Sequence, residues 1–250
     1  MTRRKPLVSI ITVCLNSEKT IARTIESVLG QTYSPIEYLV MDGASTDGTL
    51  DIVRQYERRF KGCMKIRSEK DSGLYDAMNK GIRLAKGAII GIINSDDWYE
   101  KDAVRLVVEA YRHHGEAVFY GILRVLEDGK EVMVRAVHHE SLHREVLGHP
   151  AYFVATSVYE SKGGFRPEFP NAADYELMIR LVKNHVPFVL IERVLANFTE
   201  GGTSAKNAKK TLSEYLKIRH EYGYISNMER VLTLYKYKVL SFLRKVRIRI

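Results

Sequence analysis

Short apolar runs alternate with amphipathic segments along the first half of the chain. The runs are rich in valine and isoleucine, as strands buried on both faces are. Between them, apolar residues such as Ile21, Ile25 and Val28 recur at helical spacing. The pattern predicts strands at 7–15, 36–41, 64–67 and 88–93, and helices at about 17–30, 74–85 and 101–113. A further helix is predicted after residue 49, with Leu50, Val53 and Tyr56 on one face. Such alternation with short connections predicts an α/β fold with a Rossmann-like, mostly parallel central sheet flanked by helices.

The pattern changes after residue 117. Two β-prone segments around the turn 127–130 predict a hairpin over 118–137. Further on, the sequence predicts an apolar segment at 149–154, a helix at 171–184, a strand at 188–197, a flexible connection at 199–207, and helices at 211–222 and 226–246.

Positive charge is concentrated near the C-terminus. The net charge is +9, and residues 206–250 alone carry twelve Lys/Arg and three Glu, so residues 1–205 are neutral. The length suits one domain with an appendage. We therefore expect a main domain at 1–205, with halves at about 6–115 and 116–205, and a basic helical appendage at 206–250.

Several classes of protein are disfavoured. Only Cys14 and Cys63 are present, so no disulfide framework is expected and a reducing compartment is the default. No apolar run approaches the ~20 residues of a transmembrane helix, and the first run lacks a cleavage site. Glycine-rich dinucleotide and P-loop patterns are also absent. We expect a cytoplasmic protein that is soluble or peripheral on the inner face of the membrane.

Acidic loops follow three of the predicted strands, starting at Asp42, Asp71 and Asp96. The carboxyl ends of parallel strands share one edge of a sheet, where ligands bind. Asp96 and Asp97 repel each other, and a divalent cation bridging a substrate diphosphate would relieve that repulsion. The alternative is that Asp96 caps the next helix and Asp97 is solvated.

Three motifs carry a family resemblance. They are DGASTDGT at 42–49, DSGLYDAMNKG at 71–81 and NSDD at 94–97. Each motif follows a predicted strand, and in this order the three resemble those of the family-2 nucleotide-sugar glycosyltransferases. The resemblance covers residues 6–204. It is greatest to the bacterial branch that builds surface polysaccharides and glycolipids. The resemblance implies a single-domain glycosyltransferase A fold and an inverting, metal-dependent hexosyl transfer to an acceptor hydroxyl.

The resemblance also implies a donor site. Asp42 would accept a hydrogen bond from the ring N–H of a base, which suits UDP, GDP or dTDP, although it could instead stabilise its own turn. Asp96 would contact the ribose, and Asp97, with Asp96 as a second candidate, would ligate Mn2+ or Mg2+. The other expected nucleotide-sugar residues are Thr12, Cys14, Asn16, Ser45, Asp71, Tyr75, Asp76, Asn79, Asn94 and Ser95. Lys80 is expected to be an ordinary surface residue.

Asp174 is the candidate general base. It lies where the family carries a catalytic Asp, although Ala173 replaces the usual preceding Glu. The alternative is that Asp174 only favours its helix start, and Glu176 is the fallback base. His149 resembles an acceptor-side residue but could be structural. The histidines at 138, 139 and 143 lack a metal-site pattern and are expected to be solvated.

The helix at 226–246 is basic and amphipathic. It could lie on an anionic membrane surface, which would suit a lipid-linked rather than a free saccharide acceptor, or pack on the domain or on a second subunit in a homodimer. Two other functions remain open. One is nucleic-acid binding through the basic tail. The main domain is neutral and its acidic loops would repel phosphate, so no nucleic acid is expected as a partner. The other is non-catalytic binding of a sugar nucleotide, which Asp97 and Asp174 disfavour.

Overall fold

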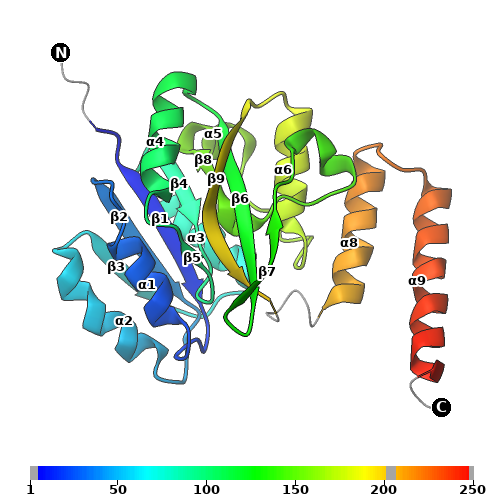
Figure 1. Ribbon diagram of the computed structural model, residues 1–250, viewed down its shortest axis with the longest axis horizontal. Helices are drawn as coiled ribbons and strands as arrows, with labels where there is room; N and C mark the ends of the chain where they lie inside the picture. Colours follow the sequence, from blue (N-terminus) through cyan, green and yellow to red (C-terminus); the bar gives the residue numbers. More distant parts are fainter. Residues whose placement is uncertain (1–4, 201–206, 248–250) are drawn as a thin grey trace.

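The computed structural model describes residues 5–200 and 207–247, and in the last helix the side chains up to residue 240. Figure 1 shows a curled central sheet with helices on both faces and the last helix, α9, outermost beyond α8. Within the described residues the sheet has nine strands, in the order β3-β2-β1-β4-β8-β6-β9-β5, with β7 paired to β6.

The first half of the sheet is parallel, as the sequence predicts. Strands β3, β2, β1 and β4 lie side by side, and residues of β1 and β4 are fully buried. Valine and isoleucine fill both faces, which explains the unbroken apolar runs. The elements are β1 (Val8–Cys14), α1 (Ile21–Leu29), β2 (Ile36–Asp42), α2 (Thr49–Glu57), β3 (Met64–Ser68), α3 (Leu74–Leu84), β4 (Ile89–Ile92) and α4 (Ala103–His114).

The second half makes the sheet mixed. β8 runs antiparallel to both β4 and β6, whereas β6 and β9 are parallel. The predicted hairpin is present as β6 and β7, while β5 and α5 were not predicted. The elements are β5 (Trp98–Tyr99), β6 (Val118–Glu127), β7 (Lys130–Arg135), β8 (Tyr152–Ala155), α5 (Thr156–Lys162), α6 (Ala173–Lys183) and β9 (Phe188–Thr199), with 3-10 turns at Arg58–Phe60, His139–His143 and His149–Ala151.

Two apolar cores lie on opposite faces of the sheet. Alternate residues of β1 point to opposite sides, so Ile10 joins one core and Ile11 the other. Helices α1, α2 and α4 pack on the first face, and α3, α5 and α6 on the second. This arrangement leaves the carboxyl ends of β1, β2, β3 and β4 along one edge.

Helix α8 (Ala208–Glu221) packs on the main domain. Its Ile218 is fully buried in the same core as Leu181 of α6. The carboxylate of Glu214 also accepts hydrogen bonds from the backbone and side-chain amides of Asn171, at 2.8 and 2.5 Å. The segment expected as an appendage is therefore divided, with α8 contributing to the core.

Helix α9 (Asn227–Arg247) contacts α8 and projects away from the sheet (Figure 1). Its apolar side chains Met228, Leu232 and Tyr235 are more than half exposed. In the part of the chain that the structure describes, no helix is both long and apolar enough to span a membrane. The expected apolar and basic side chains at 242–249, and Gly201 and Gly202 of the predicted flexible connection, lie outside the described residues.

Candidate active site

The carboxylate of Asp42 lies buried at the end of β2. It accepts hydrogen bonds from the backbone and hydroxyl of Ser45, at 3.1 and 2.5 Å, and from the hydroxyl of Ser68 at 2.6 Å. The thiol of Cys14 lies 3.7 Å away, and burial raises the pKa of that thiol, so it stays protonated and donates. Asp42 thus stabilises its own turn, and only lone pairs that these donors leave free can reach a base.

Asn16 ties the first loop to the second. It adopts a left-handed conformation, with φ of 50°, and its backbone N–H donates to the hydroxyl of Ser45 at 2.9 Å. Its side-chain oxygen accepts the backbone N–H of Thr46 at 2.9 Å. Thr12, by contrast, is fully buried and accepts the phenol of Tyr38 at 3.0 Å. Thr12 lies too deep to line a base site, so that expectation does not fit the structure.

The loop after β3 lies directly against the loop after β2. A Cβ added to Gly43 would be only 2.7 Å from a carboxylate oxygen of Asp71, so the approach needs glycine. The other oxygen of Asp71 accepts the backbone N–H of Gly73 at 2.9 Å. The two predicted acidic loops therefore share one edge of the sheet.

Lys80 closes the loop that precedes α3. Its ammonium group lies 3.3 Å from the carboxylates of both Glu69 and Asp76 and donates to the carbonyl of Lys70 at 3.0 Å. Asp76 also accepts the backbone N–H of Ser72 at 3.0 Å, and this bond, with the contact to Lys80, lowers the pKa of Asp76. Lys80 therefore links the loop to α3 through ion pairs at the surface, which is compatible with the expected surface role.

Asn79 is bonded to the backbone of Phe165. Its amide nitrogen donates to the carbonyl at 2.8 Å, and its amide oxygen accepts the N–H at 2.9 Å. Both ends of the side chain are thus engaged across the core. This geometry assigns Asn79 to holding the turn before α6, in place of the expected sugar contact.

Asp97 is completely buried. One carboxylate oxygen accepts the backbone N–H of Thr199 at 3.1 Å, and the other has no hydrogen-bond partner among the described residues. Burial and the neighbouring charge of Asp96 raise the pKa of Asp97 well above its ordinary range. Burial also raises the pKa of Asp96, which the Arg23 charge opposes. The alternative of a solvated Asp97 is wrong, and Asp102, not Asp96, occupies the cap position of α4.

These two carboxylates fit a hard divalent cation. An unpartnered buried carboxylate oxygen is costly unless it is protonated or meets a positive charge. The amide oxygen of Asn94, three residues away, is also buried without a partner within the described ranges. Over residues 5–200 and 207–240, no group of three or more His, Cys, Asp or Glu could hold a metal by itself. An ion here would need substrate phosphate oxygens, as Mg2+ sites commonly do.

Ser95 and Arg23 hold the third acidic loop against α1. The hydroxyl of Ser95 lies 2.7 Å from that of Ser17. Arg23 donates to the carbonyl of Asp96 at 2.9 Å and to the hydroxyl of Thr199 at 3.1 Å, and its guanidinium lies 3.6 Å from the ring centre of Trp98. No local motif marks Arg23, because Asp96 and Thr199 are 73 and 176 positions away in the sequence. Its role could therefore not be recognised from the sequence.

Asp174 lies in the first turn of α6, opposite the donor-side loops. Its carboxylate accepts the phenol of Tyr75, from α3, at 2.8 Å. Burial and the Asp174 charge raise the pKa of Tyr75 well above its ordinary range, so the phenol keeps its proton and donates. The structure therefore brings the candidate base into contact with the second motif.

Glu176 has a different environment. It is fully buried and accepts hydrogen bonds from Arg180 at 3.1 Å and from the phenol of Tyr222 at 2.5 Å. A carboxylate held between a guanidinium and a phenol has no access to an acceptor hydroxyl. The structure thus argues against the fallback base.

His149 is buried beside Tyr152 and Phe165, with ring centres 5.2 and 6.1 Å away. Neither ring nitrogen has a partner among the described residues, and burial lowers the pKa of His149, against the effect of the Asp174 charge.

His139 stacks on Phe188 at 5.0 Å and bonds to the phenol of Tyr120 at 2.9 Å. The expectation that all three hairpin-side histidines are solvated is therefore wrong for His139.

The fold and the acidic sheet edge define a glycosyltransferase A fold. The chain is similar to TarS of S. aureus solved with UDP-GlcNAc, with a TM-score of 0.69 and 18% identity over 84% of this chain and 66% of that one. It is also similar to the mannosyltransferase PcManGT from Pyrobaculum calidifontis solved with GDP-Man and Mn2+, with a TM-score of 0.67 and 18% identity over 87% and 64% of the two chains.

The family model of glycosyl transferase family 2 matches residues 9–176, and the chain belongs to this family. A chondroitin synthase from Escherichia coli is 29% identical over 98% of this chain. The chain spans only 36% of the length of that relative.

Proposed function

We propose that the chain transfers a sugar, with inversion, from a nucleoside-diphosphate sugar to an acceptor hydroxyl in surface polysaccharide or glycolipid synthesis. The observation that carries this proposal is the hydrogen bond between Tyr75 and Asp174, which joins the donor-side motif to a carboxylate of the acceptor half. Family membership and the names of the relatives, which include a polysaccharide synthase and structures with bound UDP-GlcNAc and GDP-Man, support the reaction class.

The donor is proposed to lie along the edge formed by the three acidic loops. Asn16, Ser45 and Asp42 are joined by hydrogen bonds beside Cys14, and offer a preorganised surface for the base. Asp71, held over Gly43, lies next to them and suits the ribose, whose hydroxyl groups can donate hydrogen bonds to its carboxylate. Preorganised polar groups of this kind fix the orientation of a ligand.

Asp97 and Asp96 would hold Mn2+ or Mg2+ together with the donor diphosphate. The support is the unpartnered buried oxygen of Asp97 and the Mn2+ bound in a structural neighbour. The ion supplies positive charge that stabilises the departing nucleoside diphosphate. Arg23 and the hydroxyl of Thr199 donate to the backbone carbonyl of Asp96, and the backbone N–H of Thr199 donates to the Asp97 carboxylate, which fixes the positions of both residues.

Asp174 is proposed to take the proton from the acceptor hydroxyl. The acceptor oxygen then forms a bond to the anomeric carbon while the bond to the nucleoside diphosphate breaks. One displacement from the opposite face inverts the configuration. Tyr75 keeps the Asp174 carboxylate oriented and is a positioning residue in this step.

Calorimetric titration with UDP, GDP and dTDP, each with and without Mn2+, tests the donor site. We expect one nucleotide to bind in a metal-dependent manner to wild type, and Asp97→Ala to abolish that dependence. Glu160→Ala is the control, since Glu160 is an exposed residue of α5 outside the acidic loops. Failure of all three nucleotides to bind with metal present would contradict the donor-site assignment.

Helix α9 is proposed to lie on an anionic membrane surface, near a lipid-linked acceptor. Met228, Val231, Leu232, Tyr235 and Val239 follow helical spacing and are 38–71% exposed. The helix also carries Arg230, Lys236 and Lys238 among its described side chains. An apolar face bordered by basic residues suits binding to an anionic interface. The cytoplasmic localisation expected from the sequence stays a prediction.

A further inference from the structure

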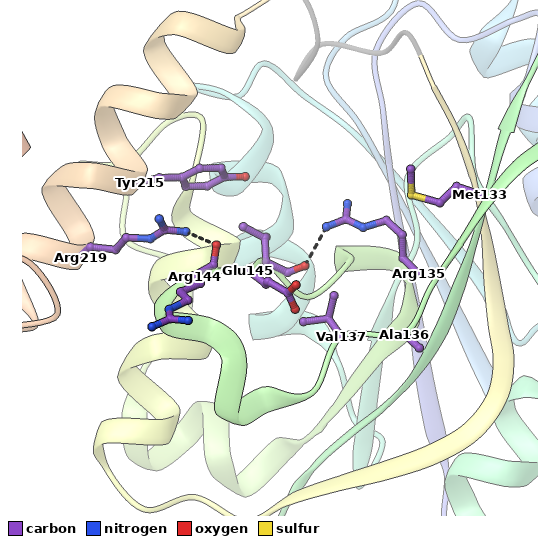
Figure 2. A pocket seen from close by; sticks show the side chains of 9 residues that line it. Met133, Arg135, Ala136, Val137, Arg144, Glu145, Tyr215 and Arg219 are labelled. Atoms are coloured by element: carbon purple, nitrogen blue, oxygen red, sulfur yellow. Dashed lines mark hydrogen bonds between the residues drawn. The ribbon is translucent and has the colours of Figure 1, made fainter. Parts of the chain in front are cut away.

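A pocket of about 490 Å³ opens between the end of β7, the segment around residue 145 and α8 (Figure 2). This volume lies within the range of small-molecule sites. No residue expected from the sequence to act in the reaction lines it. Its lining includes Arg135, Arg219, Tyr215, Glu145, Met133 and Val137.

Two guanidinium groups reach the pocket from opposite walls. Figure 2 shows Arg135 and Arg219 directed toward each other across it. Arg135 donates one hydrogen bond, to the carbonyl of Val146 at 3.2 Å. Arg219 donates to the phenol of Tyr175 at 2.8 Å and to the carbonyl of Arg144 at 2.7 Å. All these partners are neutral, and each guanidinium has five N–H donors, so both keep donors for a ligand.

The positive charge of the pocket is not neutralised by ion pairs. In the described part of the chain, no salt bridge involves Arg135 or Arg219, although Glu145 lines the same pocket. A guanidinium fork matches the two oxygens of a carboxylate or phosphate. The pair of arginines therefore favours an anionic group.

The remaining lining suits a sugar ring. Tyr215 offers an aromatic face, and Met133 and Val137 offer apolar contacts. The carboxylate of Glu145 can accept hydrogen bonds from hydroxyl groups. An apolar ring face, hydroxyl donors and one anionic group occur together in an acidic sugar, and also in a sugar phosphate.

The pocket lies beside the candidate base. Tyr215 packs edge-on against Tyr175 at 4.8 Å, and Tyr175 directly follows Asp174. Burial and the Asp174 charge together raise the pKa of Tyr215, which is consistent with this proximity. The pocket therefore belongs to the acceptor side of the molecule.

We infer that this pocket binds an anionic group of the acceptor through Arg135 and Arg219. The group is the carboxylate of an acidic sugar or the phosphate of a lipid-linked one. The inference rests on the proposed glycosyl transfer, and it names the acceptor class for the same site. It makes binding depend on the charge of the acceptor and on these two side chains.

The test measures acceptor binding by the full chain in the absence of donor. The probes are a glucuronate-terminated oligosaccharide, its carboxyl-reduced neutral counterpart, and a short-chain lipid diphosphate sugar. We expect an anionic probe to bind at least about tenfold tighter than the neutral one, with affinity falling as salt is added. The anionic probe that binds tighter identifies the carboxylate or the phosphate as the recognised group.

Arg135→Gln and Arg219→Gln are the decisive variants. We expect each to weaken binding of the anionic probe by about tenfold and to leave binding of the neutral one unchanged. Arg83→Gln is the matched control, since Arg83 is an exposed arginine of α3 outside the pocket. If Arg219→Gln fails to fold, Arg135→Gln decides, because the Arg135 side chain is exposed. Equal binding by Arg135→Gln and Arg83→Gln would overturn the inference.

Nucleotide titration separates this inference from the proposed function. If a nucleotide binds in a metal-dependent manner but the anionic and neutral acceptor probes bind equally well, the acceptor inference fails and the donor-site assignment stands. If anionic binding depends on Arg135 while no nucleotide binds, the pocket stands and the proposed transfer fails.

Discussion

The phenol of Tyr75 donates a 2.8 Å hydrogen bond to the carboxylate of Asp174, across 99 positions of sequence. Tyr75 lies in the first turn of α3, directly behind an acidic loop, and Asp174 lies in the first turn of α6. The bond therefore fixes the candidate base relative to the donor-side loops. It also gives Tyr75 a role other than the contact with the nucleotide sugar that the family resemblance implied.

Tyr75→Phe removes this hydrogen bond and keeps the ring. A hydrogen bond to a charged group contributes about 1.5–3 kcal/mol, so we expect kcat to fall by roughly 10- to 100-fold. The KM for donor should change little, because the variant affects the orientation of the base. Steady-state kinetics with varied donor measures both. Tyr111→Phe is the control, since Tyr111 packs on Phe119 and lies in α4. A raised donor KM with unchanged kcat would instead support a sugar contact.

Asp97→Asn should stabilise the metal-free protein at neutral pH. Because the pKa of Asp97 is raised in the folded state, the folded chain holds a proton that the unfolded chain releases above the ordinary value of 3.8. The contribution of Asp97 to the free energy of unfolding of the wild type is therefore lost as the pH rises from about 3.8 to the raised pKa of the folded state. Asparagine does not ionise and has no such loss. The free energy of unfolding of Asp97→Asn should therefore exceed that of the wild type by an amount that grows over this pH range, to about 1–3 kcal/mol.

Thermal unfolding at several pH values measures this effect. The Tm difference between Asp97→Asn and wild type should be small near pH 4 and larger at pH 7. Mn2+ with nucleotide should raise the Tm of wild type only. A variant that is less stable than wild type at every pH would show that the Asp97 charge is compensated within the protein.

Glu176→Gln should lower the free energy of unfolding and have little effect on kcat. The carboxylate of Glu176 accepts hydrogen bonds from Arg180 and Tyr222, and burial together with this bond raises the pKa of Tyr222 to about 12. Removing one partner of a buried ion pair costs about 3–5 kcal/mol. Urea unfolding should show a loss of this order, with kcat of the folded enzyme near that of wild type.

Asp174→Asn is the matched comparison for that variant. Asp174 is not fully buried, so we expect stability near wild type. Loss of a general base should reduce kcat by roughly 10²- to 10⁴-fold. If Glu176→Gln lowered kcat by this amount and Asp174→Asn lowered only the stability, Glu176 would be the base.

Leu232→Asp should weaken binding to anionic vesicles. Leu232 is 51% exposed on the apolar face of α9, so a carboxylate there opposes both apolar insertion and lipid charge. Vesicle sedimentation should show that wild type binds anionic vesicles and not neutral ones. Leu84→Asp, at an exposed position of α3, is the control. Concentration-dependent dimerisation that Leu232→Asp abolishes, without vesicle binding, would assign the face to a second subunit.

Periodicity and residue type determined the first half of the fold. The runs at 7–15 and 36–41 could be recognised as buried strands because valine and isoleucine fill both faces of a parallel sheet. The position of each acidic loop behind a strand then placed Asp42, Asp71 and Asp96 at one edge. The family could be recognised from the same short motifs, because their order and spacing are local properties of the chain.

Contacts between distant segments were decided only by the tertiary structure. The burial of Asp97 depends on Thr199, the role of Asn79 depends on Phe165, and α8 joins the core through Ile218. Thr12 lies inside the core because Tyr38 covers it from the next strand. A sequence shows that a carboxylate, an amide or an apolar face is present, but packing determines which partner it meets. The ionisation and accessibility of each side chain follow from that partner.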